Sequence, residues 1–264
     1  MVTLKDLLGE DKARSRMKTE QELFDVIDNV IKDNKLNLLY DNDIIKYSSR
    51  IKGIDNTVDM LCVEAIAKYL IEKNIFNFEV KKESNYSRGD RKKIREKLKN
   101  INFYEYINET SYGKGSKNMM EDRICQCLFS QEKVSDCLVI DFQIPLVDGG
   151  ANNIDIMFEK NGKCHIAEAK KFESPETLLR CILEIETYYQ QINWPRFIDE
   201  YKFEKKDVIK TILVPEDSEA YKEYRVMKEG YLPYLNRLFN LFNIQMYSFA
   251  LDKDNNQFLI KEAN

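Results

Sequence analysis

The chain has 264 residues, of which 43% are hydrophobic and 33% are charged, with nine glycines and five prolines. This composition excludes collagen-like, low-complexity and mainly disordered proteins, and the length allows one large domain or two small ones. Forty-one basic and 45 acidic side chains give a formal charge of −4. That balance excludes a strongly basic protein that coats nucleic acid, but not an enzyme with a local basic surface.

The first part of the chain is helical in pattern. A capping signal precedes residues 20–31, in which apolar side chains recur at helical spacing. Residues 58–70 show the same spacing more strongly and predict a second helix that begins just after Asn56 and Thr57. Residues 1–18 lack an apolar period, which indicates partial disorder. We therefore predict a helical N-terminal region, residues 1–110, that serves recognition or dimerisation.

A basic segment lies inside this region. Residues 81–99 carry nine basic and three acidic side chains, a net charge of +6 in an otherwise acidic chain. Such a run is typical either of a surface that contacts the phosphate backbone of a nucleic acid or of a solvated helix with mixed charges. The sequence favours neither interpretation over the other. Under the first, the nucleic-acid-binding residues are Lys81, Lys82, Arg88, Arg91, Lys92, Lys93 and Arg95.

The second part, residues 111–264, alternates between helical and strand patterns. We expect a short helix from Met119 to about residue 130, then strands at 137–147, 153–159 and 163–170. A long helix is predicted to begin at Ser174-Pro175, since Ser suits an N-cap and Pro the first turn, and to end near residue 192. A strand at 207–214, a helix at 231–243 and a closing hairpin of 244–251 with 257–260 complete the list. This order predicts an α/β domain whose first three strands form a meander.

The turn between the second and third strands fixes their register. Asn161-Gly162 is a strong hairpin signal, because both central positions of the favoured two-residue turn need positive φ. The register that follows places Asp155 directly across from Glu168. Because side chains alternate along a strand, Lys170 shares the face of these two carboxylates. His165 is predicted to point to the opposite face and to be structural.

Opposed carboxylates on one face have a chemical consequence. With Cβ atoms about 5 Å apart, they repel unless something neutralises them. A divalent cation does so directly, and Mg²⁺ prefers carboxylate and carbonyl oxygens. A metal held in this way would neutralise a phosphodiester and generate hydroxide near neutral pH. The alternative is that Asp155, Glu168 and Lys170 are exposed charges of an edge strand.

These residues also carry a resemblance. Asp155, twelve intervening residues and then Glu168-Ala169-Lys170 resemble the D…E-x-K signature of the PD-(D/E)XK nuclease superfamily. The predicted elements between about residues 116 and 215 are similar to its restriction-endonuclease-like αβββαβ core with a mixed sheet. The resemblance implies that Asp155, Glu168 and the backbone carbonyl of Ala169 bind Mg²⁺, with Mn²⁺ as a substitute. It also implies that Lys170 orients or activates the attacking water. No proline precedes Asp155, where Ile154 stands instead.

Two further residues follow from the resemblance. In this superfamily a glutamate on the first core helix often completes the metal site, and Glu121 occupies the corresponding place. Asn118 and Glu121 equally fit a capping box, in which Glu121 reaches back to the N-cap amide. The helix after the E-x-K strand often contributes a glutamine or tyrosine, which makes Gln190 a candidate catalytic residue. A Tyr/Gln run on a long helix is also typical of packing and solvated surface.

The expected function is a metal-dependent nuclease that hydrolyses phosphodiester bonds, in DNA rather than RNA. A type II restriction endonuclease fits by size, a repair or phage-defence nuclease fits equally, and cleavage of both strands at one site would favour a homodimer. The alternative is a nuclease-fold protein that no longer cuts and serves as a nucleic-acid-binding or protein-interaction module. No apolar run approaches the roughly 18 residues of a transmembrane helix, and the charged N-terminus lacks the core of a secretory signal. We therefore expect a cytoplasmic protein with no membrane partner.

Overall fold

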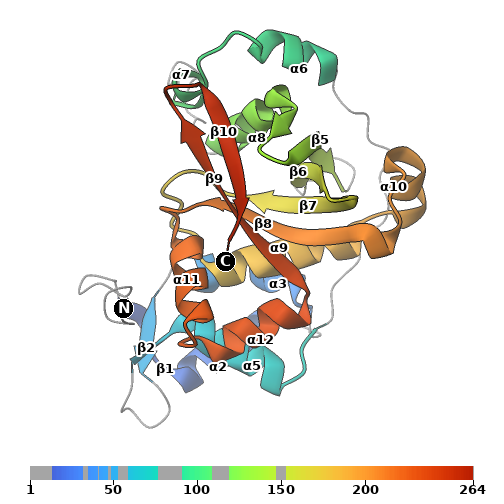
Figure 1. The fold of residues 1–264 in the computed structure, drawn as a ribbon. Helices are drawn as coiled ribbons and strands as arrows, with labels where there is room; N and C mark the ends of the chain where they lie inside the picture. The colour runs from blue at the N-terminus through green and yellow to red at the C-terminus, as the bar shows by residue number, and fades with distance from the viewer. Residues whose placement is uncertain are drawn as a thin grey trace. The chain divides into compact units, whose positions relative to one another are not determined.

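The computed structural model describes residues 14–31, 35–40, 42–46, 49–52, 59–76, 91–108, 119–146 and 153–263. The chain divides into two compact units (Figure 1). The helical unit comprises Met1–Val80, Glu173–Thr187 and Asp217–Asn243, and the sheet unit comprises Lys81–Phe172, Tyr188–Glu216 and Ile244–Asn264. Within the described ranges, no helix has the length and apolar character needed to cross a membrane.

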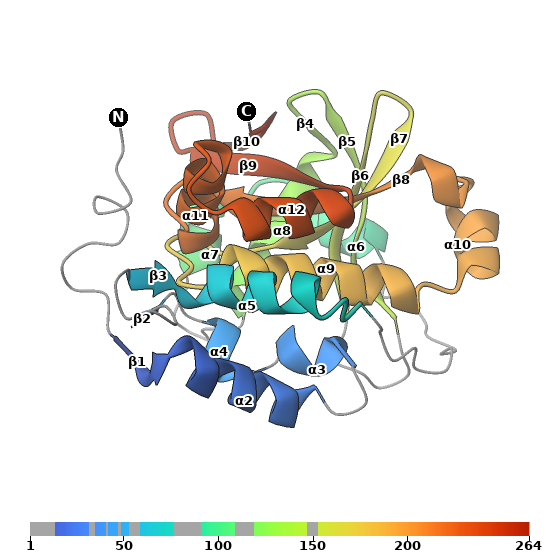
Figure 2. The same cartoon turned by 90° about the horizontal axis from the view of Figure 1, so that it is seen from below.

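The helical unit combines helices from three parts of the chain with one small sheet. Its helices are α2 (Glu20–Val30), α3 (Asn37–Tyr40), α4 (Asp43–Lys46), α5 (Cys62–Glu72), the first part of α9 (Leu178–Gln191), α11 (Glu219–Lys228) and α12 (Pro233–Leu241). The sheet consists of β1 (Arg14–Thr19), β2 (Arg50–Lys52) and β3 (Asp59–Leu61). Helix α5 packs against both α2 and α12 (Figure 2), and nearly all of its side chains up to Leu70 are buried.

Side-chain caps fix the helix ends in this unit. Thr19 begins α2 and accepts the N–H of Glu22 at 3.2 Å. Glu64, buried on α5, accepts the first free N–H groups of α12, those of Tyr234 and Leu235, at 2.8 and 2.9 Å. The first N–H groups of a helix have no intrahelical partner, so a buried carboxylate satisfies them and complements the helix dipole. These bonds join α5 to α12 in addition to the apolar contact.

The sheet unit is built on seven strands in the order β10-β9-β8-β7-β6-β5-β4. They are β4 (Lys133–Val134), β5 (Cys137–Pro145), β6 (Asn153–Lys160), β7 (Lys163–Ala169), β8 (Val208–Pro215), β9 (Ile244–Asp252) and β10 (Gln257–Glu262). The pairs β7–β8 and β8–β9 are parallel and the other pairs are antiparallel, so the sheet is mixed. The other elements of the unit are α6 (Arg91–Leu98), α7 (Phe103–Asn108), α8 (Met119–Gln131), α10 (Trp194–Tyr201) and the 3₁₀ turn η3 (Lys205–Asp207).

Helix α8 covers one face of this sheet and helps to protect its edge. The buried face includes Ile156, Phe158, Ala167 and Ala169, which pack in one cluster with apolar side chains of α8. At the end of α8, the side-chain amide of Gln131 bonds both backbone groups of Phe258 on β10, at 2.7 and 3.0 Å. The edge strands β4 and β10 also approach each other, so the sheet is nearly closed.

The structure confirms the α/β class and the central hairpin. Lys160 pairs with Lys163, Phe158 with His165 and Ile156 with Ala167, which is the predicted register. Asn161 and Gly162 have φ of 53° and 75°, as the predicted turn demands. His165 is buried and stacks on Phe158, with ring centroids 4.7 Å apart, so it is structural as expected.

Two helix starts were wrong. Helix α5 begins at Cys62, because Asp59–Leu61 pair with β2 instead of forming the first turn. Helix α9 begins at Leu178 rather than at Ser174-Pro175, because Thr177 is the residue whose hydroxyl oxygen accepts the N–H of Arg180, at 3.2 Å. The predicted disorder of residues 1–18 lies outside the described residues except at 14–18, which belong to β1.

The division of the chain differs from the expected boundary at residue 110. Helices α6 and α7 join the sheet unit, because Leu98 is buried and Phe103 and Ile107 enter the core cluster around α8. Helices α11 and α12 follow β8 in sequence but join the helical unit with α5. The N-terminal helices therefore depend on segments more than a hundred residues away.

Candidate active site at the end of β7

Asp155 on β6 is fixed by two hydrogen bonds. Its Oδ2 accepts the backbone N–H of Ala169 at 2.8 Å, and its Oδ1 accepts from Nε2 of Gln143 at 3.2 Å. The β6–β7 ladder ends at the Ile156–Ala167 pair, just before Asp155, and the carboxylate takes the place of the next backbone partner. The predicted register therefore brings Asp155 to the end of β7, where it bonds Ala169, but the ladder does not include the predicted Asp155–Glu168 pair.

Gln143 is a residue that the sequence did not single out. It lies on β5 with φ of 45°, a left-handed conformation that non-glycine residues rarely adopt. Its Oε1 accepts from Nδ2 of Asn153 at 3.2 Å, which fixes the direction of the amide that donates to Asp155. Such strain clusters at functional sites, where the surroundings hold it in place. The only sequence signal is a polar residue near the end of an apolar strand.

Glu168 and Lys170 form a buried ion pair. The Nζ of Lys170 lies 2.5 Å from Oε1 of Glu168, and each residue is only 3% exposed. Lys170 follows the last residue of β7, and its backbone N–H bonds the carbonyl of Leu213 on β8 at 3.1 Å. The exposed edge-strand interpretation of these two charges is therefore wrong.

Glu121 on α8 reaches the same stretch of backbone. Its Oε1 accepts the N–H of Lys171 at 3.3 Å. Asn118, the other member of the proposed capping box, lies outside the described residues. Burial raises the pKa of the Cys125 thiol well above its usual value, and the negative charges of Asp155, Asp122, Glu121 and Glu168 raise it further. The three carboxylates among the predicted metal ligands thus lie in one region next to α8.

These carboxylates do not converge on a single point. In the part of the chain that the structure describes, no group of three or more His, Cys, Asp or Glu side chains is placed to hold one metal ion. Mg²⁺ does not need such a group, since it keeps several waters and binds through one or two carboxylates. Asp155 and Glu168 are carboxylates of this type, and in the structure the two oxygens of Asp155 and Oε1 of Glu168 already contact protein donors. Glu121 does not complete a third position here.

The remaining predicted catalytic residue differs from this buried pair in its exposure. Gln190 is exposed near the end of α9, whereas the neighbouring Gln191 and Tyr188 are buried. Helical periodicity explains the difference, because adjacent residues on a helix point about 100° apart.

The basic segment serves packing in part. Lys81, Lys82 and Arg88 lie outside the described residues. Arg91 donates to Oδ1 of Asp141 at 2.9 Å and to the carbonyl of Phe142 at 2.5 Å, while Arg95 lies 4.3 Å from the centre of the Phe129 ring. These two arginines attach α6 to β5 and α8. Lys92 and Lys93 are exposed.

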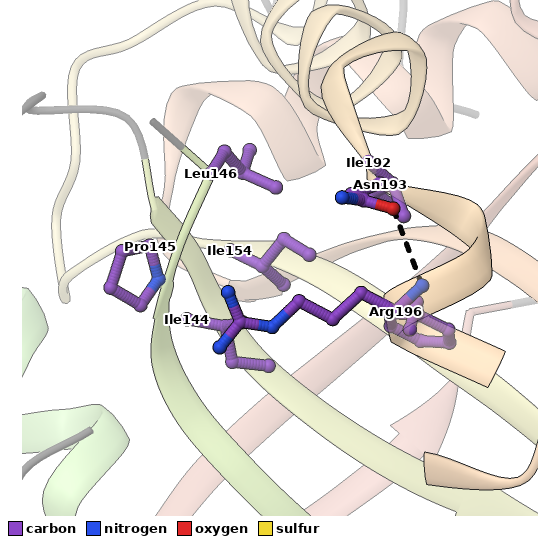
Figure 3. A pocket seen from close by; sticks show the side chains of 8 residues that line it. Ile144, Pro145, Leu146, Ile154, Ile192, Asn193 and Arg196 are labelled. Carbon is purple, nitrogen blue, oxygen red and sulfur yellow. Dashed lines mark hydrogen bonds between the residues drawn. The ribbon is translucent and has the colours of Figure 1, made fainter. Parts of the chain in front are cut away.

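A small apolar pocket lies near the start of β6 (Figure 3). Ile144 and Pro145 of β5, Ile154 of β6 and Ile192 line it, and the side chain of Arg196 extends across it toward β5. Asn193 caps α10 here by accepting the N–H of Arg196 at 3.3 Å. Because Ile154 precedes Asp155, the pocket adjoins the strand that carries the candidate site.

Comparisons of the chain with protein-family models, with curated proteins and with solved structures found no match.

Proposed function

We propose that this protein is a metal-dependent nuclease that hydrolyses phosphodiester bonds in DNA on a restriction-endonuclease-like PD-(D/E)XK core. The observation that carries the proposal is the buried Glu168–Lys170 pair beside Asp155 at the end of β7. The element order supports it, since α8, the β5–β6–β7 meander, α9 and β8 occur in the order of an αβββαβ core, with β4 inserted after α8 and α10 and η3 inserted before β8.

Asp155, Glu168 and the carbonyl of Ala169 would hold Mg²⁺. In an extended strand the N–H and C=O of one residue point to the same side, so the carbonyl of Ala169 faces the side where Asp155 binds its N–H. When bound, the ion supplies charge neutralisation on the phosphate and a water of lowered pKa. Gln143 and the N–H of Ala169 keep Asp155 in one orientation. Such partners of ligating carboxylates commonly set metal affinity.

Lys170 is the group that would meet the reacting atoms. Glu168 holds its ammonium at the end of β7 and balances its charge within a buried site. The Lys170 ammonium has three N–H donors, which it presents at the end of β7. In the proposed reaction they orient the attacking water and stabilise negative charge on a phosphate oxygen.

A second candidate function has its own supporting observation. Both oxygens of Asp155 accept hydrogen bonds from the protein, and Oε1 of Glu168 is bound by Lys170. A nuclease-fold protein that binds nucleic acid without cutting would keep the Asp155 carboxylate satisfied in this way. The two candidates differ in whether metal displaces these protein donors.

The deciding experiment is a cleavage assay. The purified protein is incubated with supercoiled plasmid, linear duplex, single-stranded DNA and RNA, each with Mg²⁺, Mn²⁺ or EDTA. We expect cleavage of DNA that EDTA abolishes and that Glu168→Gln slows by about a hundredfold or more. Glu262→Gln makes the same chemical change on an exposed residue of β10 and is the matched control.

Three outcomes are informative. Cleavage that persists in Glu168→Gln at the control rate would refute the assignment of the site. Binding without cleavage in any metal would favour the non-cutting module. Cleavage of RNA alone would retain the hydrolytic site and correct the substrate.

A further inference from the structure

A cluster of aromatic rings and lysines lies where α9 ends and α10 begins. We define the aromatic–lysine patch as Tyr189, Trp194, Lys205 and Lys210. The rings of Tyr189 and Trp194 meet edge to face, with centroids 4.9 Å apart. The Nζ of Lys205 lies 4.9 Å from the centre of Trp194, and that of Lys210 lies 4.7 Å from the centre of Tyr189.

The patch lies on the same face of the sheet as the candidate active site. Lys210 on β8 pairs with Ile166 on β7, and Ile166 and Glu168 point to the same side because they are two residues apart. One strand spacing and two residues of strand rise put the Cα atoms of Lys210 and Glu168 about 8 Å apart. A ligand on the patch would therefore lie on the face of the sheet that carries the proposed reacting atoms.

Within the described ranges, no carboxylate pairs with Lys205, so the charge of this lysine is not offset. Among the residues that the structure describes, none forms an ion pair with Lys205, which is exposed. Nearby Lys163, in contrast, lies 2.5 Å from Asp207. Lys205 therefore presents positive charge directly over the rings of Tyr189 and Trp194. The π face of an aromatic ring such as Tyr189 or Trp194 attracts the lysine ammonium.

Trp194 is the only tryptophan of the chain, and it is not in the core. It starts α10 and remains partly exposed, as does Tyr189. Trp194 packs on the ring of the buried Phe197, with centroids 5.6 Å apart, and Tyr189 and Trp194 both keep part of their surface exposed. The combination of surface rings and cations is the one that binds single-stranded nucleic acid, in which bases stack on aromatic side chains and a positive groove follows the phosphates.

We propose that the aromatic–lysine patch binds a single-stranded segment of nucleic acid, with bases stacked on Tyr189 and Trp194 and phosphates held by Lys205 and Lys210. The inference rests on the proposed function in one respect, because it makes an unpaired strand the substrate of that site. Binding itself does not require cleavage.

The test uses the single tryptophan as the reporter. The wild-type protein in EDTA is titrated with a fifteen-nucleotide dT oligomer, the matching rU oligomer and a fifteen-base-pair duplex. We expect the single strands to quench Trp194 fluorescence and the duplex to leave it nearly unchanged. The dT and rU arms separate DNA from RNA as the source of the strand.

Variants identify the contacts. Trp194→Leu, followed by anisotropy of a labelled dT oligomer, should weaken binding by about five- to a hundredfold, since one stacked base is lost. Lys205→Ala/Lys210→Ala should make the slope of log K against log salt less negative by about 1.4, since two phosphate contacts are lost. Lys133→Ala/Lys253→Ala removes two exposed lysines of the same unit and should leave the slope unchanged. Thermal unfolding of each variant separates lost contacts from lost fold.

The outcomes separate this inference from the nuclease proposal. Equal binding of dT by the wild type and by folded patch variants would overturn the patch, whatever the cleavage assay gives. Binding of duplex alone would also overturn it. Quenching with no cleavage in any metal would support the patch and refute the nuclease.

Discussion

Buried carboxylates occur in both units, and their partners differ even within one unit, since Glu20 of the helical unit pairs at 3.1 Å with Lys68, whose side chain is 24% exposed. In the helical unit, Glu64 and Glu223 accept backbone N–H groups at helix starts, those of Tyr234 and Leu235 and that of Leu178. In the sheet unit, Glu168 is paired instead with the ammonium of Lys170 at a strand end. The free N–H groups at the helix starts explain why carboxylates are placed there, because such groups need an acceptor.

The buried Glu168–Lys170 ion pair has no such structural reason, because it lies at a strand end rather than at a helix start. Removing two charges from water costs several kcal/mol each, and apolar residues of similar volume are often equally stable or better. An ion pair at the end of β7, both residues 3% exposed, is therefore a poor device for stability alone. A buried charge therefore indicates function only once the partner of that charge has been identified.

The comparison predicts first that breaking the Glu168–Lys170 ion pair strongly destabilises the protein. Lys170→Met leaves the charge of Glu168 buried without its cation, so we expect the free energy of unfolding to fall by about 3–5 kcal/mol. Urea denaturation measures it directly. Lys170→Met/Glu168→Leu removes both charges and should regain most of the loss. A double variant no more stable than the single one would contradict this account.

A buried base on the same strand gives the second prediction. Burial, and secondarily the charge of Lys160, lowers the pKa of His165 from 6.5 to about 4. Phe158, Tyr247 and Thr211 also face the ring, and none of them offsets a positive charge. Since the unfolded chain takes up the proton first, stability is lost as pH falls from about 6.5 to about 4.

The size of this loss follows from the shift. At about 1.4 kcal/mol per pH unit, it amounts to roughly 3 kcal/mol at pH 4 relative to pH 7. His165 is the only histidine, so no other imidazole contributes. His165→Gln should show a flatter dependence of unfolding free energy on pH. An unchanged slope would show that His165 is not the acid-sensitive group.

Local signals in the sequence were sufficient for part of the site. The Asn161-Gly162 turn fixed the register of β6 and β7, and with it the approach of Asp155 to the end of β7. Turn geometry depends on a few adjacent residues, so it survives tertiary packing. The burial of Glu168 and Lys170 was not predictable in the same way, because it depends on elements that cover the strand.

Other features escaped prediction because tertiary contacts decide them. The charge of residues 81–99 suggested a phosphate-binding surface, yet Arg91 bonds Asp141 and its guanidinium lies 4.2 Å from the ring of Phe142. Composition does not distinguish a solvated arginine from one that packs. The role of Gln143 was not predictable from the sequence either, since its strained φ and its bond to Asp155 arise only when β5 and β6 pair.

The third prediction tests the helical unit. Glu64→Ala leaves two N–H groups of α12 without their acceptor, so we expect a loss of about 1–3 kcal/mol in unfolding free energy. Burial raises the pKa of Glu64, against the smaller lowering effect of the two backbone bonds. The folded protein therefore gains stability from this group as pH falls from neutral toward 4.5, its ordinary value.

The cost of Glu64→Ala should accordingly be larger at pH 5 than at pH 7. Glu72→Ala removes an exposed carboxylate from the same helix, which accepts the hydroxyl of Tyr234 at 3.4 Å rather than an N–H of α12, and is the control, with a smaller change at either pH. Measured urea midpoints at the two pH values test both statements. A cost that shrinks on acidification would mean that the charged form of Glu64 is the favoured one, and the contrast between the two units would fail.

The smallest effect is expected at Gln143, where the fold is unaffected and only the site responds. Gln143→Leu removes the donor to Asp155 and keeps a side chain of similar size, so affinity for Mn²⁺ should fall about tenfold, as is usual when a partner of a ligating carboxylate is lost. The shift of the melting temperature with Mn²⁺ concentration measures this without any need for cleavage. Gln245→Leu, on β9, is the control for the loss of an amide elsewhere in the sheet. Equal Mn²⁺ dependence in Gln143→Leu and the control would show that Asp155 needs no such partner, and the strained backbone at Gln143 would then lack a role in metal binding.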